Sequence, residues 1–210
     1  MTLFDISRAL NPRLAVWPGD TPFSLTQTLD RRRGDAVNLT TLTLSAHTGA
    51  HVDAPHHVAD DALTVEALDL HPYWGRAQVV TVSKASGPLA PADFAPFEVG
   101  LAPRLLVHSA ASHVGPAHFP RQIVFPSPEL AAWLGSLGII LYGTDAPSMD
   151  AVDSKTLPGH NALLKHGIAI LEGLDLSRAP DGLYELSALP LKIEGGDGSP
   201  VRAALRSAGD

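Results

Sequence analysis

The spacing of apolar and polar positions predicts a chain built largely of β-strands. Residues 23–30 and 38–46 alternate apolar and polar side chains, which is the pattern of a strand with one buried face. Shorter, mostly apolar runs bounded by proline and glycine predict further strands. These runs lie at residues 3–6, 77–83, 104–109, 138–143, 168–172, 182–189, 190–193 and 200–205.

Helix signals are fewer. Residues 127–137 are predicted to be helical, because Ser127 is a favourable N-cap and Pro128 fits the first helical position. Gly138 supplies a stop signal, and a second, shorter helix is predicted at residues 159–166. Because strands dominate and do not alternate regularly with helices, the chain is predicted to be an α+β or mixed-sheet domain, not a repeating βαβ fold.

Length and composition are those of an ordinary globular protein. Domains commonly contain ~100–200 residues, so we expect residues 1–210 to form a single domain. The chain is 45% hydrophobic and 18% charged, which argues against extensive disorder. Its 18 prolines and 18 glycines imply many loops, where functional residues are usually found.

Charge and residue usage exclude several functional classes. The net charge of −7 argues against nucleic-acid binding, which needs a basic face. No segment approaches the ~18 apolar residues of a membrane span, and the N-terminus lacks the pattern of a signal peptide, so we expect a cytoplasmic protein. The absence of cysteine excludes disulfides and thiolate ligands. Any metal would therefore be held by His, Asp and Glu.

Residues 47–57 contain four histidines and an aspartate. His47, His51, Asp53 and His57 occupy odd-numbered positions and would share one face of an extended strand, whereas His56 would face outward. Two imidazoles and a carboxylate can hold a cation such as zinc and leave a position for water. The cation would lower the pKa of that water from ~15.7 towards ~7, and His57 could transfer the proton.

The backbone of this segment must depart from a straight strand. Six extended residues span about 20 Å at ~3.3 Å each, whereas metal–ligand bonds are ~2.0–2.2 Å long. Gly49 and Pro55 could allow the chain to curl. Alternatively, residues 47–51 could form a helical turn, which also places positions i and i+4 side by side.

The pattern His-x-Gly-x-His-x-Asp-x-Pro-x-His resembles the signature of the cyclase family of metal-dependent hydrolases. Later blocks are similar to those of its arylformamidase branch, and the resemblance covers nearly the whole chain. These blocks are residues 17–20, 143–150, 157–160, 169–173, 188–192 and 198–202. Two positions depart from the family pattern: Ala50 replaces a common Thr, and His56 replaces a residue that is often apolar. Residues 108–120 match no family block and are expected to form a surface excursion.

The resemblance implies a site with two zinc ions per subunit, although manganese would also suit such ligands. The implied ligands are His47, His51, Asp53, His160 and Glu172. Asp53 and Glu172 would contact both ions, His57 would be the catalytic acid/base, and Trp17 would contact the substrate ring. Asp145 and Asp150 are expected to be turn-forming residues around Pro147.

The resemblance also implies a fold and an activity. The expected fold is a mixed β/α domain of the swivelling β/β/α type, with a small barrel-like sheet and flanking helices. The expected substrate is a small aryl formamide: N-formyl-L-kynurenine would be hydrolysed to L-kynurenine and formate, in tryptophan degradation, by a metal-bound hydroxide. A homodimer is expected, in which the loop carrying Trp17 could reach a neighbour's site.

Two alternatives stay open. A related amidohydrolase, such as an isatin hydrolase, would share the first motif and differ in substrate. A non-catalytic metal-binding protein on the same scaffold would hold metal without turning over amides. His57 argues against the second alternative, because a purely structural metal site does not require a base that is not a ligand.

Overall fold

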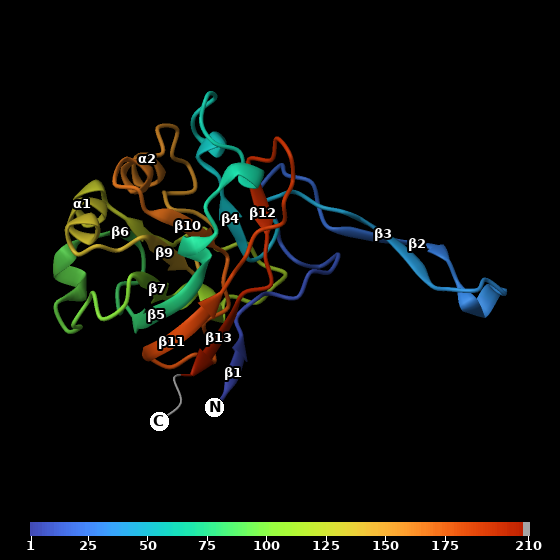
Figure 1. Ribbon diagram of the computed structural model, residues 1–210, viewed down its shortest axis with the longest axis horizontal. Helices are drawn as coiled ribbons and strands as arrows, with labels where there is room; N and C mark the ends of the chain where they lie inside the picture. Colours follow the sequence, from blue (N-terminus) through green and yellow to red (C-terminus); the bar gives the residue numbers. More distant parts are fainter. Residues whose placement is uncertain (208–210) are drawn as a thin grey trace.

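The computed structural model describes residues 1–207, whose main feature is a curled, half-barrel sheet of nine strands (Figure 1). Strands β5, β7, β9 and β10 run parallel to one another, and the outer strands pair antiparallel. In sheet order the strands are β1 (Leu3–Asp5), β13 (Ala204–Ser207), β11 (Gly182–Ser187), β5 (Trp74–Thr81), β7 (Arg104–His108), β9 (Leu141–Thr144), β10 (Ala169–Glu172), β4 (His51–Asp53) and β12 (Gly198–Pro200). This mixed α+β architecture is the predicted one.

Helices α1 (Pro128–Ser136) and α2 (Pro158–Lys165) pack on one side of the sheet (Figure 1). Successive side chains of a strand point to opposite faces, so the sheet contributes to two apolar clusters. Leu105 and Val107 of β7 pack with Leu130 and Leu134 of α1. Leu106 lies between them in sequence and belongs to the cluster on the other face. This double burial explains why the central strands are continuously apolar.

Both predicted helices are present. The Ser127 hydroxyl accepts a hydrogen bond from the Leu130 amide at 3.1 Å, so it caps α1 as its residue type indicates. Gly138 follows the helix in a left-handed conformation with φ of 76°. No helix of the described residues is long and apolar enough to cross a membrane.

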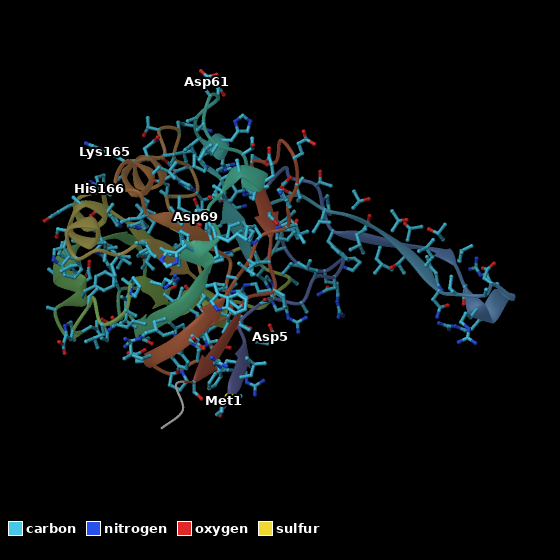
Figure 2. The ribbon with its side chains drawn as sticks, viewed as in Figure 1. Met1, Asp5, Asp61, Asp69, Lys165 and His166 are labelled. Atoms are coloured by element: carbon cyan, nitrogen blue, oxygen red, sulfur yellow. The ribbon has the colours of Figure 1, made fainter. Side chains whose placement is uncertain are left out.

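Strands β2 (Ser24–Leu29) and β3 (Leu39–Thr43) form an antiparallel hairpin, here called the arm, that projects away from the sheet (Figures 1 and 2). The prediction that these strands are half-buried is wrong for the single chain. Leu25 and Leu42 are paired across the arm and are 52% and 53% exposed. Their alternation marks an apolar face, but nothing in the described residues covers it.

Other departures from the predicted elements involve short segments. Residues 190–193 form no strand, and the strand predicted at 200–205 is divided between β12 and β13. Strand β4 was not predicted, nor were β6 (Gly87–Leu89) and β8 (Val124–Pro126), which pair with each other. A strand of three residues is too short to show an alternation of apolar and polar side chains in the sequence. The 3-10 helices are η1 (Arg31–Arg33), η2 (Pro55–His57), η3 (Val65–Ala67), η4 (His71–Tyr73), η5 (Pro91–Phe94) and η6 (Ala110–His113).

Candidate metal centre and active site

The register of two neighbouring strands builds the core of the candidate site. On antiparallel strands β4 and β10, His51 lies directly opposite Glu172, so both side chains project from the same face. Asp53 lies two residues beyond His51 and faces the same way. Val52, between them, points into the apolar core. The sheet therefore juxtaposes groups that are more than a hundred residues apart in sequence.

His51, Asp53, His160 and Glu172 form a closed, buried cluster. The Nε2 atom of His51 lies 3.4 Å from Asp53 Oδ1 and 3.3 Å from Glu172 Oε2. The Nε2 atom of His160, on α2, lies 3.4 Å from Asp53 Oδ2 and 3.3 Å from Glu172 Oε1. Each carboxylate thus presents one oxygen to each imidazole. Two carboxylates shared by two histidines in this way can bridge a pair of cations.

The Nδ1 atoms of both histidines are held by acceptors on the protein side. His51 Nδ1 donates to the Gly49 carbonyl at 2.8 Å, because a carbonyl oxygen can only accept. His160 Nδ1 donates to Asp150 Oδ2 at 2.7 Å. In the neutral rings the lone pairs are therefore on Nε2, which faces the two carboxylates. This is the usual support of metal-binding histidines, whose second nitrogen is fixed by an outer partner.

The electrostatics of the cluster are those of a site that attracts positive charge. Burial by itself lowers the histidine pKa values, but hydrogen bonds to Asp53 and Glu172 raise the pKa of His51 to about 10. For His160, burial is outweighed by Asp150, Asp53 and Glu172, and its pKa rises to about 12. Burial raises the pKa of Asp53, but bonds from His160, His47 and His51 hold it well below its ordinary value.

The donor set fits a divalent cation. Asp53 Oδ2 and Glu172 Oε1 are buried, and their contacts with His160 Nε2 at 3.4 and 3.3 Å are not aligned as hydrogen bonds. Such an arrangement is costly for an ionised carboxylate unless a cation neutralises it. Bonds of ~2.0–2.2 Å in tetrahedral geometry place ligand atoms about 3.3–3.6 Å apart. The separations of 3.3–3.4 Å in the cluster match that spacing. His51, Asp53 and Glu172 together could hold one ion.

His47 and His57 lie next to this cluster. His47 Nδ1 is 3.0 Å from Asp53 Oδ1, and the His47 and His57 ring centroids are 4.1 Å apart. Asp197 was missed by sequence reasoning; its Oδ2 lies 3.0 Å from His47 Nε2 and 3.4 Å from His57 Nδ1. His47, Asp53 and His57 also form a set that could hold a metal ion. The geometry thus allows His57 to be either an acid/base or a ligand.

The chain before β4 curls, which is the first of the two predicted alternatives; the second, a helical turn at residues 47–51, is not formed. Residues 46–50 form a turn without helix, and Gly49 adopts a left-handed conformation with φ of 71°. Gly173 follows Glu172 and packs against this turn. A Cβ atom on Gly173 would lie 2.2 Å from the Gly49 carbonyl oxygen, so only glycine allows this approach.

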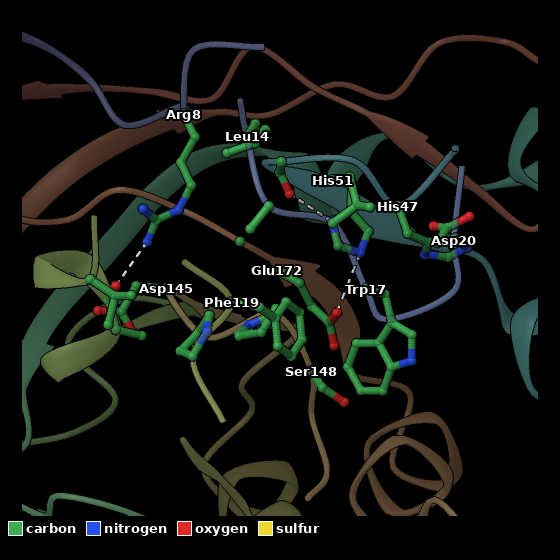
Figure 3. A pocket seen from close by; sticks show the side chains of 18 of the residues that line it. Arg8, Leu14, Trp17, Asp20, His47, His51, Phe119, Asp145, Ser148 and Glu172 are labelled. Atoms are coloured by element: carbon green, nitrogen blue, oxygen red, sulfur yellow. Dashed lines mark hydrogen bonds and ion pairs between the residues drawn. The ribbon is translucent and has the colours of Figure 1, made fainter. Parts of the chain in front are cut away.

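A cavity of about 330 Å³ opens onto the cluster, a size suited to a small organic ligand (Figure 3). The Trp17 and Phe119 rings line it in an edge-to-face arrangement with centroids 5.3 Å apart. The structure thus places Trp17 in the cavity of its own chain. Segment 110–120 supplies much of one wall. The expectation of a surface excursion at 108–120 holds for residues 115–118, which are exposed, but not for residues 109, 111 and 112, which are buried.

Asp145 and Asp150 are buried anchors, not simple turn residues. Asp145 accepts hydrogen bonds from the Ser109 amide, the Ser109 hydroxyl and the Ser112 amide, which fixes η6 on the cavity wall. Asp150 accepts bonds from the backbone amides of residues 159 and 160 as well as from the His160 ring. A carboxylate within a Gly/Pro block was the available signal for both. Neither could be linked to its partners without the fold.

His56 does not face outward as predicted. It is half-buried, whereas His57 is the more exposed of the two. The Nδ1 atom of His56 is buried without a hydrogen-bond partner. The alternation of odd and even positions between two faces fails here, because both residues lie in η2, which is not extended.

Comparisons with known proteins identify the family and the fold. The family model named Cyclase, described as "Putative cyclase", matches residues 4–151. A kynurenine formamidase of Salinibacter ruber is 44% identical over 211 residues, covering all of both chains. A solved structure described as a potential metal-dependent hydrolase with cyclase activity superposes with a TM-score of 0.84 at 24% identity, covering 99% of each chain. Isatin hydrolase A from Labrenzia aggregata gives a TM-score of 0.81 at 26% identity, covering 97% of this chain and 93% of that one.

Proposed function

The chain belongs to the cyclase family, and on that premise we propose that it is the hydrolase that converts N-formyl-L-kynurenine to L-kynurenine and formate. The observation that carries the proposal is the buried cluster of two histidines and two carboxylates at the end of a cavity lined by aromatic rings. The 44% identity to a kynurenine formamidase over the full length supports this substrate above others.

We propose that the site holds two zinc ions per subunit, with manganese as the alternative ion. His47, His51, Asp53 and Glu172 would hold one ion, and His160 with the same two carboxylates would hold the other. When bound, such cations act as Lewis acids and lower the pKa of water from ~15.7 towards ~7. The unpartnered oxygens of Asp53 and Glu172 support this assignment.

The protein's own residues then position the substrate and move protons. Trp17 and Phe119 would hold the aryl ring, with the formyl group directed at the cluster. Water gives up a proton to His57 as its oxygen adds to the formyl carbon, the carbon–nitrogen bond breaks, and that proton is delivered to the departing aryl amine. His57 lines the cavity and would supply this proton, while Asp197 fixes the orientation of its ring.

We also propose a homodimer, formed through the arm. Leu25 and Leu42 face one another across the two strands and are half-exposed, and Leu39 nearby is 49% exposed. A projecting hairpin with an apolar face is a surface that a second copy of the chain could cover. Residues 1–210 would act as one domain in the cytoplasm, with no membrane or nucleic-acid partner.

The central experiment combines elemental analysis with an assay of N-formyl-L-kynurenine hydrolysis before and after chelation. We expect close to two metal ions per chain, loss of activity on chelation and recovery on adding zinc back. Isatin assayed in parallel distinguishes the alternative substrate, which the fold similarity to isatin hydrolase A motivates. Bound metal without turnover of either substrate would contradict the proposal and favour a metal-binding protein.

A further inference from the structure

One cationic side chain in the cavity is not used by the proposed chemistry. Arg8 lines the cavity and is the only Lys or Arg among the described residues that do so. Its guanidinium lies on the side of the cavity away from His47, His51 and Glu172 (Figure 3). Apart from histidines, the other charged residues of the lining are the acids Asp20, Asp145 and Glu172. Arg8 therefore supplies a fixed positive charge at the end of the cavity away from the cluster.

Arg8 is held in place but is not neutralised. Its Nη2 donates to the Ala111 carbonyl at 3.0 Å, which is its only hydrogen bond to the described residues. No carboxylate of residues 1–207 lies within 4.0 Å of it. A guanidinium has five N–H donors, so several stay available to a ligand. Asp145 is occupied by bonds from Ser109 and Ser112.

We propose that Arg8 binds the α-carboxylate of the substrate and so selects aryl formamides that carry an amino-acid tail. This inference rests on the proposed function, because it assigns the tail of that substrate to the far end of the same cavity. The formyl group would lie at the histidine–carboxylate cluster and the ring against Trp17 and Phe119. The planar guanidinium is suited to this role, because it can engage both oxygens of a carboxylate at once.

A matched pair of substrates tests the assignment. N-formylkynuramine keeps the formamide, the ring and the amino group of N-formyl-L-kynurenine and lacks only the carboxylate. For the unaltered protein we expect kcat/KM to favour the carboxylate substrate by about 10- to 100-fold, the range of a charge-assisted hydrogen bond. Arg8→Met should abolish this preference. Arg8→Lys should retain part of it, because the charge remains and the two-pronged geometry is lost.

The substrate ratio separates recognition from a structural role. Arg8 also ties the N-terminal segment to η6 through Ala111, and loss of that tie would lower kcat/KM for both substrates equally. An equal loss, or an unaltered protein without preference for the carboxylate, would overturn the proposal. So would a preference that persists in Arg8→Met.

Binding of the products distinguishes this inference from the proposed function. Dissociation constants of L-kynurenine and kynuramine are measured by calorimetry on the metal-loaded protein and on Arg8→Met. Tighter binding of L-kynurenine that disappears in the variant supports the role of Arg8 even if hydrolysis is absent, in which case only the proposed function fails. Equal binding of both amines to the unaltered protein overturns the role of Arg8 even if N-formyl-L-kynurenine is hydrolysed.

Discussion

The arm and the strand trio β4, β10 and β12 depart from the usual distribution of residues in opposite directions. The arm exposes leucines, with Leu25 and Leu42 each more than half accessible. The trio buries charge, with Asp53 and Glu172 both 3% exposed. Under the proposals above, the open apolar face of the arm would be covered by a second copy of the chain, and the buried carboxylate oxygens without a hydrogen-bond partner would bind a small cation.

The two regions differ in how much free energy is gained when a partner covers the arm or a cation neutralises the carboxylates. Covering the exposed half of a leucine contributes about 1 kcal/mol. Leaving an ionised carboxylate buried without a counter-charge costs several times more. Changes at the trio should therefore have larger effects than changes in the arm, and they should act on different measurements.

The largest effect is expected at the carboxylate shared by the histidines. Asp53→Asn keeps the shape but removes the charge that faces His47, His51 and His160. Hydrolysis should fall by roughly 10⁴-fold or more, because water would regain its ordinary pKa. Elemental analysis should show loss of metal. Asp145→Asn is the control and should keep its metal, because Asp145 is similarly buried but its hydrogen bonds go to Ser109 and Ser112 and not to a histidine. Metal retained in Asp53→Asn would contradict the assignment of Asp53 as a ligand.

The next effect is expected at His57. His57→Ala should lower turnover by roughly 10²–10⁴-fold, the usual contribution of a general acid/base. Metal content should be retained, which elemental analysis of the purified variant tests. Loss of metal together with activity would instead make His57 a ligand with His47 and Asp53, the other role that the geometry allows.

A smaller effect is expected one step outside the cluster. Asp150 accepts the His160 Nδ1–H at 2.7 Å, so Asp150→Asn should loosen the ring and change the electron density at Nε2. Metal affinity or activity should fall by roughly 10–100-fold. A competition titration with a chromophoric chelator measures the affinity. An affinity equal to that of the unaltered protein would show that Asp150 does not support the site.

The smallest effect on activity is expected in the arm. Replacing Leu25 and Leu42 together by Glu should shift a dimer towards monomer in light scattering, because four charges would meet at one interface. Metal content should not change. Leu63→Glu is the matched control, because Leu63 is 57% exposed and lies outside the arm. If light scattering shows that the unaltered protein is a monomer, the proposed role of the arm is refuted.

Local features were predictable wherever a few neighbouring residues decide the outcome. The cap Ser127 and the apolar runs of the central strands depend on chemistry among near neighbours in the chain. The curl at Gly49 was one of two alternatives that the sequence left open. The first histidine motif belongs to the same class, because His47, His51 and Asp53 are close in sequence. His160 and Glu172 were named from a family resemblance, since no spacing links them to residue 53.

Only the tertiary structure decided what those local features face. The register of β4 against β10 sets His51 opposite Glu172, and such registers are decided by packing of the whole sheet. The fold likewise made Asp145 and Asp150 buried anchors, gave His57 its partner Asp197, and brought Arg8 to the cavity. In the arm, alternation determined that one face is apolar but not that this chain leaves it open. The alternation of residues in the sequence indicates whether one face of a strand is apolar, and only the three-dimensional arrangement determines what covers that face.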